Sequence, residues 1–223
     1  MMKKYVLTGG PGSGKSSILL ALEQRGEAIM REAAEDYIRY RQAMGVKEPW
    51  KEIDFQDKIL DLQIRRERDA EKIAKNGRVW LDRGVIDGLA YEQLAGRAKC
   101  GRTAARIMQR AAKPYEKVFL IENLGHCRKN GIRRENQEEA LELEKLQEQN
   151  YYEAGYDVIR IPAGPLEKRL EKVLKEIEEY GGEKNGKRRI QTNRFGFYTF
   201  THIYRLQNSD VGESSRQMCY RQS

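Results

Sequence analysis

The chain has 223 residues, 39% of them hydrophobic and 34% charged, which is enough for one α/β domain with a sizeable core and an appendage. No stretch approaches the roughly 20 apolar residues that span a bilayer, and no signal-peptide pattern opens the chain, so we expect a cytoplasmic protein without stable membrane insertion. The three cysteines lie far apart, so we expect no structural zinc site. The net charge of +8 is uneven, because the tail after residue 180 carries +5 and the preceding residues only +3, so the excess charge does not indicate nucleic-acid binding by the main domain.

Short apolar runs alternate with helical patterns through the first 180 residues. We expect strands at residues 5–8, 27–30, 78–82, 117–121 and 157–161. We expect helices at about residues 15–25, 33–44, 54–75, 87–94, 101–112, 136–154 and 165–180. Strands that alternate with helices predict a parallel sheet covered on both faces, and residues 1–180 are the predicted domain.

The first strand runs into a glycine-rich loop. Gly9, Gly14, Lys15 and Ser16 match the pattern G-x-x-x-x-G-K-[ST], known as Walker A, with an apolar strand before it and a helical pattern after it. Such a loop points successive N–H groups at a phosphate, while the lysine reaches the β and γ phosphates and the serine ligates Mg²⁺. The predicted nucleotide-binding residues are Gly9, Gly10, Pro11, Gly12, Ser13, Gly14, Lys15, Ser16 and Ser17.

Two carboxylates follow the second strand. Glu32 lies near the predicted strand end, where it fits either a base that takes a proton from an acceptor hydroxyl or an ordinary carboxylate at a helix start. Glu35 stands four residues before Arg39, a spacing typical of a solvated helix face.

The third strand ends in Asp82-Arg83. An acid at this strand tip can hold Mg²⁺ opposite Ser16, and an arginine fork suits phosphoryl oxygens or the acceptor. Asp87 fits the N-cap of the next helix, with facing the site as the less favoured alternative.

A basic segment follows the fourth strand. Arg133 and Arg134 stand just before an acidic helix, where a mobile lid would deliver an arginine to the transferring phosphoryl group. The alternative is a solvated charge cluster that pairs with the glutamates of that helix.

Residues 181–223 form a basic, aromatic tail without a sustained helical period. We expect it to be either partly disordered or docked as an extra strand or hairpin, with an anionic partner as one hypothesis.

The segments GGPGSGKSS, REAAEDYI, WLDRGVIDGLAY and GIRREN together resemble the small AAA-domain family of kinase-like P-loop NTPases, with more distant similarity to ribosylnicotinamide and thymidylate kinases. The resemblance covers about residues 3–178. It implies a three-layer P-loop NTPase fold with a five-stranded parallel sheet in the order 2-3-1-4-5, and a Mg²⁺-dependent site for ATP or GTP. Small kinases of this fold are often dimers, so a homodimer is one expectation.

The leading hypothesis is phosphoryl transfer from ATP to a small-molecule acceptor, with Lys15, Glu32, Asp82, Arg83, Arg133 and Arg134 as catalytic residues and Ser16 and Asp82 as metal ligands. ATP is favoured over GTP because no N/T-K-x-D guanine signature is visible. The alternative is a slow ATP- or GTP-hydrolysing switch with a protein, lipid or RNA partner. A kinase linked to RNA is a weaker third hypothesis.

Overall fold

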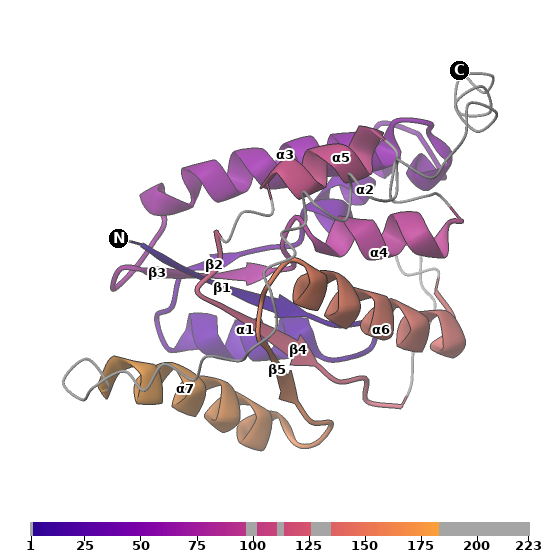
Figure 1. The fold of residues 1–223 in the computed structure, drawn as a ribbon. Helices are drawn as coiled ribbons and strands as arrows, with labels where there is room; N and C mark the ends of the chain where they lie inside the picture. Colours follow the sequence, from indigo (N-terminus) through magenta and orange to yellow (C-terminus); the bar gives the residue numbers. More distant parts are fainter. Residues whose placement is uncertain (1, 97–101, 111–113, 126–134, 183–223) are drawn as a thin grey trace, which may run out of the picture. The chain divides into compact units, whose positions relative to one another are not determined.

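The computed structural model describes residues 2–96, 102–110, 114–125 and 135–182. Its centre is a five-stranded parallel sheet with the strand order β2-β3-β1-β4-β5 (Figure 1). The strands are β1 (Lys3–Thr8), β2 (Ile29–Met30), β3 (Arg78–Asp82), β4 (Lys117–Ile121) and β5 (Val158–Ile161). The predicted sheet and its strand order are confirmed.

The helices follow the predicted succession. They are α1 (Lys15–Gln24), α2 (Ala33–Ala43), α3 (Phe55–Asp69), α4 (Asp87–Leu94), α5 (Arg102–Arg110), α6 (Gln137–Glu153) and α7 (Leu166–Gly182), with short 3-10 turns η1 (Pro49–Lys51) and η2 (Ala70–Lys72). The helix expected over 54–75 is shorter than predicted, because its last turn tightens into η2. Asp87 is the first residue of α4 and the N-cap is Ile86, which corrects the favoured interpretation of Asp87 as a cap.

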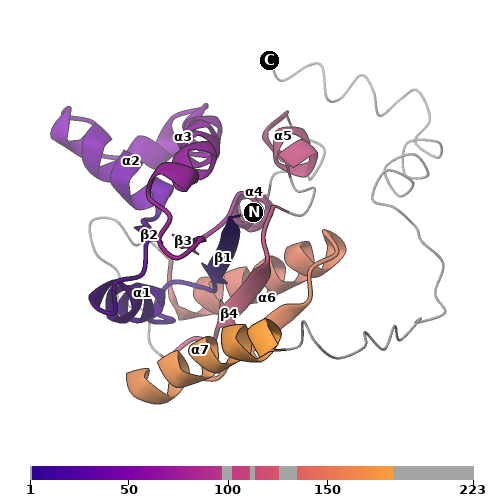
Figure 2. The ribbon, with the colours of Figure 1, turned by 90° about the vertical axis from the view of Figure 1, so that its left-hand side faces the viewer.

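Alternating side chains of the strands form two hydrophobic clusters. On one face Tyr5 and Leu7 of β1 pack with α1 and α7, and on the other face Val6 packs with α3, α4, α5 and α6. Figure 2, which looks at the molecule from the side, shows α1 and α7 on one side of the sheet and α4 and α6 on the other. The sheet is therefore covered on both faces, as parallel sheets generally are.

The central position of β1 decides where the site lies. Its neighbours are β3 and β4, with Leu7 in register with Asp82 and Thr8 with Leu120. All strands are parallel, so the segments that follow β1, β3 and β4 leave the sheet at one edge. In open parallel sheets this edge is the usual place for a ligand site.

Two predictions lie partly or wholly outside the described residues. The basic segment with Arg133 and Arg134 is one of them, and the tail after residue 182 is the other. Among the helices that the structure describes, none has both the length and the hydropathy needed to cross a membrane.

Candidate active site

The glycine-rich loop between β1 and α1 needs glycine where other backbone comes close. A Cβ atom on Gly9 would lie 2.3 Å from the carbonyl oxygen of Ile121, and one on Gly10 would lie 2.2 Å from that of Ala140. Gly9 also has a φ of 130°, which L side chains rarely adopt. The end of β4 and the first turns of α6 are therefore packed directly against the loop, and any side chain at these two positions would push them away.

Side chains donate hydrogen bonds to several carbonyl oxygens of the loop. The Lys15 ammonium donates to the oxygens of Gly9 (2.6 Å) and Gly10 (3.0 Å). The Asn123 side chain donates to the Pro11 oxygen at 2.8 Å, and Arg169 donates to the Ser13 oxygen at 2.6 Å. Because a trans peptide points its N–H away from its C=O, these bonds turn several amides of the loop the opposite way.

The N–H groups of the loop are largely unoccupied. Within the described residues, no hydrogen bond engages the amides of Gly12, Gly14, Lys15 and Ser16. Such free donors at the start of a helix form an anion-binding concavity, and the positive end of the α1 dipole adds to it. The local structure therefore has the arrangement that a phosphate-binding loop requires.

Lys15 lies inside this concavity. Its side chain is buried, and its ammonium has a third contact to the Ser13 hydroxyl at 3.1 Å. Burial, followed by the positive charge of Arg83, lowers the pKa of Lys15 to about 8. An anion bound in the loop would relieve both penalties, which makes the ammonium well suited to a phosphate.

Asp82 lies at the end of β3, beside the loop. Its carboxyl is buried, and its Oδ1 atom has no hydrogen-bond partner among the described residues. Burial, reinforced by the nearby Glu32, raises the pKa of Asp82 to about 6. A buried carboxylate oxygen without a donor fits the oxygen ligand that Mg²⁺ prefers, directly or through water. Ser16, the other predicted ligand, lines the cavity described below.

Arg83 connects three parts of the site. It is a non-glycine residue with a φ of 70°, a strained backbone of the kind often found at functional sites. Its Nε atom donates to Glu32 at 3.0 Å, and its Nη1 atom donates to the Gly9 oxygen and to Asp87, each at 3.2 Å. The ring of Tyr91 lies 5.3 Å from the guanidinium carbon. The guanidinium is therefore fixed between the loop, the end of β2 and α4.

Asp87 holds this arrangement in place, a role that its assignment as a cap did not anticipate. It is buried and accepts hydrogen bonds from the Thr8 hydroxyl (2.6 Å), the Tyr151 hydroxyl (2.6 Å) and the Gly84 amide (3.0 Å), in addition to Arg83. β1, α4 and α6 are thus tied together at one carboxylate behind the loop.

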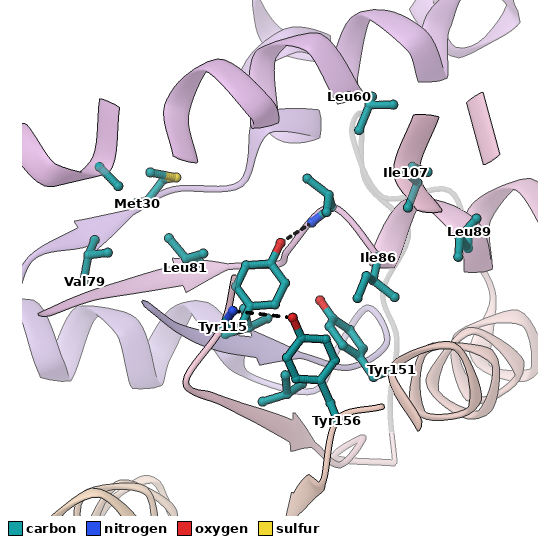
Figure 3. Packing of buried hydrophobic residues seen from close by; sticks show 14 of the residues in the cluster. Met30, Leu60, Val79, Leu81, Ile86, Leu89, Ile107, Tyr115, Tyr151 and Tyr156 are labelled. Carbon is teal, nitrogen blue, oxygen red and sulfur yellow. Dashed lines mark hydrogen bonds between the residues drawn. The ribbon is translucent and has the colours of Figure 1, made fainter. Parts of the chain in front are cut away.

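A second polar network supports the segment after Arg83, and Figure 3 shows one part of it, the hydrogen bond at the Tyr115 hydroxyl. The Tyr115 hydroxyl accepts from the Val85 amide at 2.8 Å and donates to Glu67 at 2.9 Å. Gln63 donates to Glu67 at 2.8 Å and to the Arg83 carbonyl at 3.2 Å. Burial raises the pKa of Glu67, which is consistent with its position deep behind the site. Helix α3 therefore holds the strained turn that presents Arg83.

One cavity of about 580 Å³ extends from the loop into the helices. Its polar end contains Lys15, Ser16, Glu32, Arg83 and Asp87. Its other end is lined by apolar side chains of α2, α3, the β3–α4 turn and α5, namely Ile38, Phe55, Ile59, Leu60, Val85 and Ile107. The cavity is thus continuous from a phosphate-type site to an apolar chamber.

Most of the predicted site residues line the cavity, whereas Gly9, Gly10 and Ser13 belong to the loop but are not among the lining residues. Lys15, Ser16, Glu32 and Arg83 line one cavity together with Pro11, Gly12, Gly14 and Ser17, and Asp82 lies beside it. Glu35, which the sequence favours as a surface residue, also lines the cavity and pairs with Arg39 at 2.7 Å. Arg133 and Arg134 lie outside the described residues, so their part in the site stays a prediction.

Several supporting residues carry little or no signal in the sequence. Asn123, Arg169, Tyr115 and Tyr151 reach the site from segments far along the chain, and only the sheet topology brings them there. Asn123 has a positional clue, because it is the second residue after β4 and that strand end borders the loop.

Comparison with known proteins gives solved structures of the same fold. A sequence comparison with curated proteins gives no match. Among solved structures, the NadR protein in complex with NAD and AMP-PNP has a TM-score of 0.58 at 17% identity, over 88% of this chain and 52% of that one. This chain thus spans about half the length of NadR. Thymidylate kinase from Candida albicans has a TM-score of 0.55 at 11% identity, over 81% and 92%. Deoxyadenosine kinase from M. mycoides, in a structure with dCMP and dCDP, has a TM-score of 0.51 at 13% identity, over 79% and 99%.

These structural likenesses establish the fold, a P-loop kinase fold, and the sequence establishes the family. The profile of a family described as AAA domain matches residues 4–169, which is most of the chain. The chain therefore belongs to this AAA-domain family of kinase-like P-loop NTPases.

Proposed function

We propose that this protein is a Mg²⁺-dependent phosphotransferase that passes the terminal phosphoryl group of ATP to a hydroxyl of a small metabolite. The observation that carries the proposal is the single cavity that joins the phosphate-type loop to an apolar chamber. A protein that only hydrolysed nucleotide would need a water at the loop, whereas a chamber of this kind suits the body of a second substrate.

The loop would bind the triphosphate. The amides of Gly12, Gly14 and Ser16, which no described group engages, would donate to phosphate oxygens, and the Lys15 ammonium is buried among oxygens that a phosphate would replace or join. Ser16 and Asp82 would hold Mg²⁺, which when bound supplies charge neutralisation at the β and γ phosphates. The unpartnered Oδ1 atom of Asp82 supports its assignment as a ligand.

Glu32 is the proposed base. It lines the cavity between the loop and the chamber, and Arg83 holds its carboxylate at 3.0 Å. In the proposed reaction the acceptor hydroxyl gives its proton to Glu32, its oxygen forms a bond to the γ phosphorus, and the bond from that phosphorus to the bridging oxygen breaks. ADP leaves with the electron pair of that bond.

Arg83 would act from the same place. Its guanidinium is held by the Gly9 oxygen and Asp87, so it is positioned before any substrate arrives. Such fixed positive charge next to a transferring phosphoryl group needs no reorganisation during the reaction. The lid arginines Arg133 and Arg134, the cytoplasmic location and a homodimer remain predictions that accompany this proposal.

The decisive assay is Mg²⁺-dependent release of ADP from ATP, with and without a pooled panel of nucleosides, nucleotides and vitamins. We expect ADP release to depend on the pool and to be lost in Lys15→Ala, while Lys145→Ala, which removes an exposed lysine of α6, keeps it. Division of the pool would then identify the acceptor.

A second pair of variants tests the base. Glu32→Gln should lower kcat by about 100-fold or more, a loss typical of removing a positioned base. Glu35→Gln changes the same kind of side chain in the same cavity and should have a much smaller effect, since Glu35 is engaged with Arg39 at its exposed side. ADP release that is slow and indifferent to the pool would refute the phosphotransferase and favour the hydrolysing switch.

A further inference from the structure

Arg169 on α7 is a buried cation attached to the back of the phosphate-binding loop. Only 4% of the residue is exposed. Its Nη2 atom donates to the carbonyl oxygen of Ser13 at 2.6 Å and to that of Glu122 at 3.2 Å. Its Nε atom has no hydrogen-bond partner among the described residues. The guanidinium is therefore held by main-chain oxygens on the side of the loop opposite to the phosphate site.

No carboxylate neutralises this charge within the part of the chain that the structure describes. The acidic residue beside it, Glu122, has its carboxylate engaged by Arg160 at 3.2 Å and by the Ala163 amide at 3.4 Å. Burial lowers the pKa of Arg169, with the charge of Glu122 only partly opposing this effect. A buried and unpaired guanidinium destabilises a fold, so a merely structural role would be served better by a neutral side chain.

The contact with Ser13 bears directly on the loop. The Ser13 carbonyl and the Gly14 N–H belong to one peptide unit, and in a trans peptide they point in opposite directions. Because Arg169 binds the oxygen, the Gly14 N–H is turned towards the phosphate side, where no described group engages it. A charged donor on the oxygen also polarises the N–H of the same peptide and makes it a stronger donor.

The charge itself is close to the loop. A Cβ atom on Gly14 would lie 2.9 Å from the Nη1 atom of Arg169, so one layer of backbone separates the guanidinium from the inner side of the loop. Positive charge in a buried environment of low effective dielectric acts on nearby phosphates with little screening.

We propose that Arg169 is a positioning residue for nucleotide binding, which turns the Ser13–Gly14 peptide towards the phosphates and places buried positive charge behind it. The inference rests on the proposed binding of a nucleotide at this loop. It predicts a graded dependence on charge, in which Arg169 contributes most to the affinity for ATP, less for ADP and least for AMP.

The test uses the full-length protein and isothermal titration with ATP, ADP and AMP in the presence of Mg²⁺. Arg169→Met removes the charge and both hydrogen bonds, and Arg169→Lys keeps the charge. Arg160→Met is the matched control, because it removes a nearby arginine that pairs with Glu122 and Glu148 and does not contact the loop.

We expect Arg169→Met to weaken ATP binding by about tenfold or more, a loss typical of charge-assisted hydrogen bonds. The loss should be smaller for ADP and smallest for AMP, Arg169→Lys should recover part of the ATP affinity, and Arg160→Met should bind all three as the wild type does. If Arg169→Met does not fold, a smaller loss in Arg169→Lys that follows the same order of nucleotides supports the proposal, and unchanged affinity in that variant overturns it.

The opposing outcomes separate the two proposals. Unchanged affinity, or an equal loss for all three nucleotides, would show that Arg169 only supports the scaffold and would overturn this inference alone. A wild-type protein that binds none of the three nucleotides would overturn both this inference and the proposed function.

Discussion

Replacing Asp82 with asparagine should stabilise the nucleotide-free protein at neutral pH, although it removes a proposed Mg²⁺ ligand. Burial raises the pKa of Asp82 from its ordinary 3.8 to about 6, so the folded protein binds this proton more tightly than the unfolded chain does. As the pH rises from about 4 to about 6, the wild type therefore loses stability that Asp82→Asn cannot lose. A pKa difference of about two units corresponds to about 3 kcal/mol. The raised pKa already includes the attraction of the carboxylate to Lys15 and Arg83, so we expect a gain of about 1–3 kcal/mol in the free energy of unfolding.

Urea unfolding of the two proteins at a series of pH values measures this difference. The gain should be near zero at about pH 4, grow through about pH 5 and 6, and stay constant above about pH 7. Asp157→Asn, which removes the same charge from an exposed position, serves as the control. Mg²⁺ and ATP should reverse the order by stabilising only the protein that binds them. A variant that is less stable than the wild type at pH 8 without nucleotide would refute the reasoning that burial dominates at Asp82.

Two further predictions concern Lys15 and the tyrosines behind the site. Because the pKa of Lys15 is lowered to about 8, affinity for ATP should fall by up to about tenfold between pH 8 and 9 as the ammonium deprotonates. Lys15→Arg should abolish this pH dependence even if its affinity is lower. Calorimetric titration with ATP at both pH values measures the change in affinity. Tyr115→Phe should lower the free energy of unfolding by about 1–3 kcal/mol, because it leaves the Val85 amide without a partner and removes one of the two side-chain donors to the Glu67 carboxyl. Tyr156→Phe should cost less, since its hydroxyl has only a 3.4 Å contact with the Tyr115 amide, and equal losses in urea unfolding would contradict the assigned network.

The fold could be read almost completely from the sequence, since each strand is a short apolar run and each helix carries a pattern of its own. The strands at Arg78–Asp82 and Lys117–Ile121 begin and end where the pattern predicts. The largest deviation is at α3, where charged residues continue the helical pattern past Asp69 but the backbone tightens into a 3-10 turn. Local patterns therefore suffice for the elements, and they are less reliable at the element ends.

The site was predictable only in part. The phosphate-binding loop and Asp82-Arg83 can be identified from the sequence because their chemistry depends on residues close together in the chain. The contacts that orient them cannot be identified in this way, because Arg169 and Ser13 lie 156 positions apart and Tyr151 and Asp87 lie 64 apart. An arginine on a helix that is otherwise amphipathic looks like any surface arginine until the sheet topology places it behind the loop.

The central position of β1 also sets the order in which the protein can be assembled. The first strand to be synthesised needs β3 and β4 as neighbours, and about half of the chain must be made before β4 exists. Closing such long segments slows folding and leaves an unpaired strand edge on the incomplete chain. The phosphate-binding loop reaches its final conformation later still, because it is contacted by residues that are synthesised after most of β4, namely Ile121, Asn123 and Arg169. Only a chain whose synthesis has reached α7 holds every contact that shapes the loop, so nucleotide binding would report that the fold is complete.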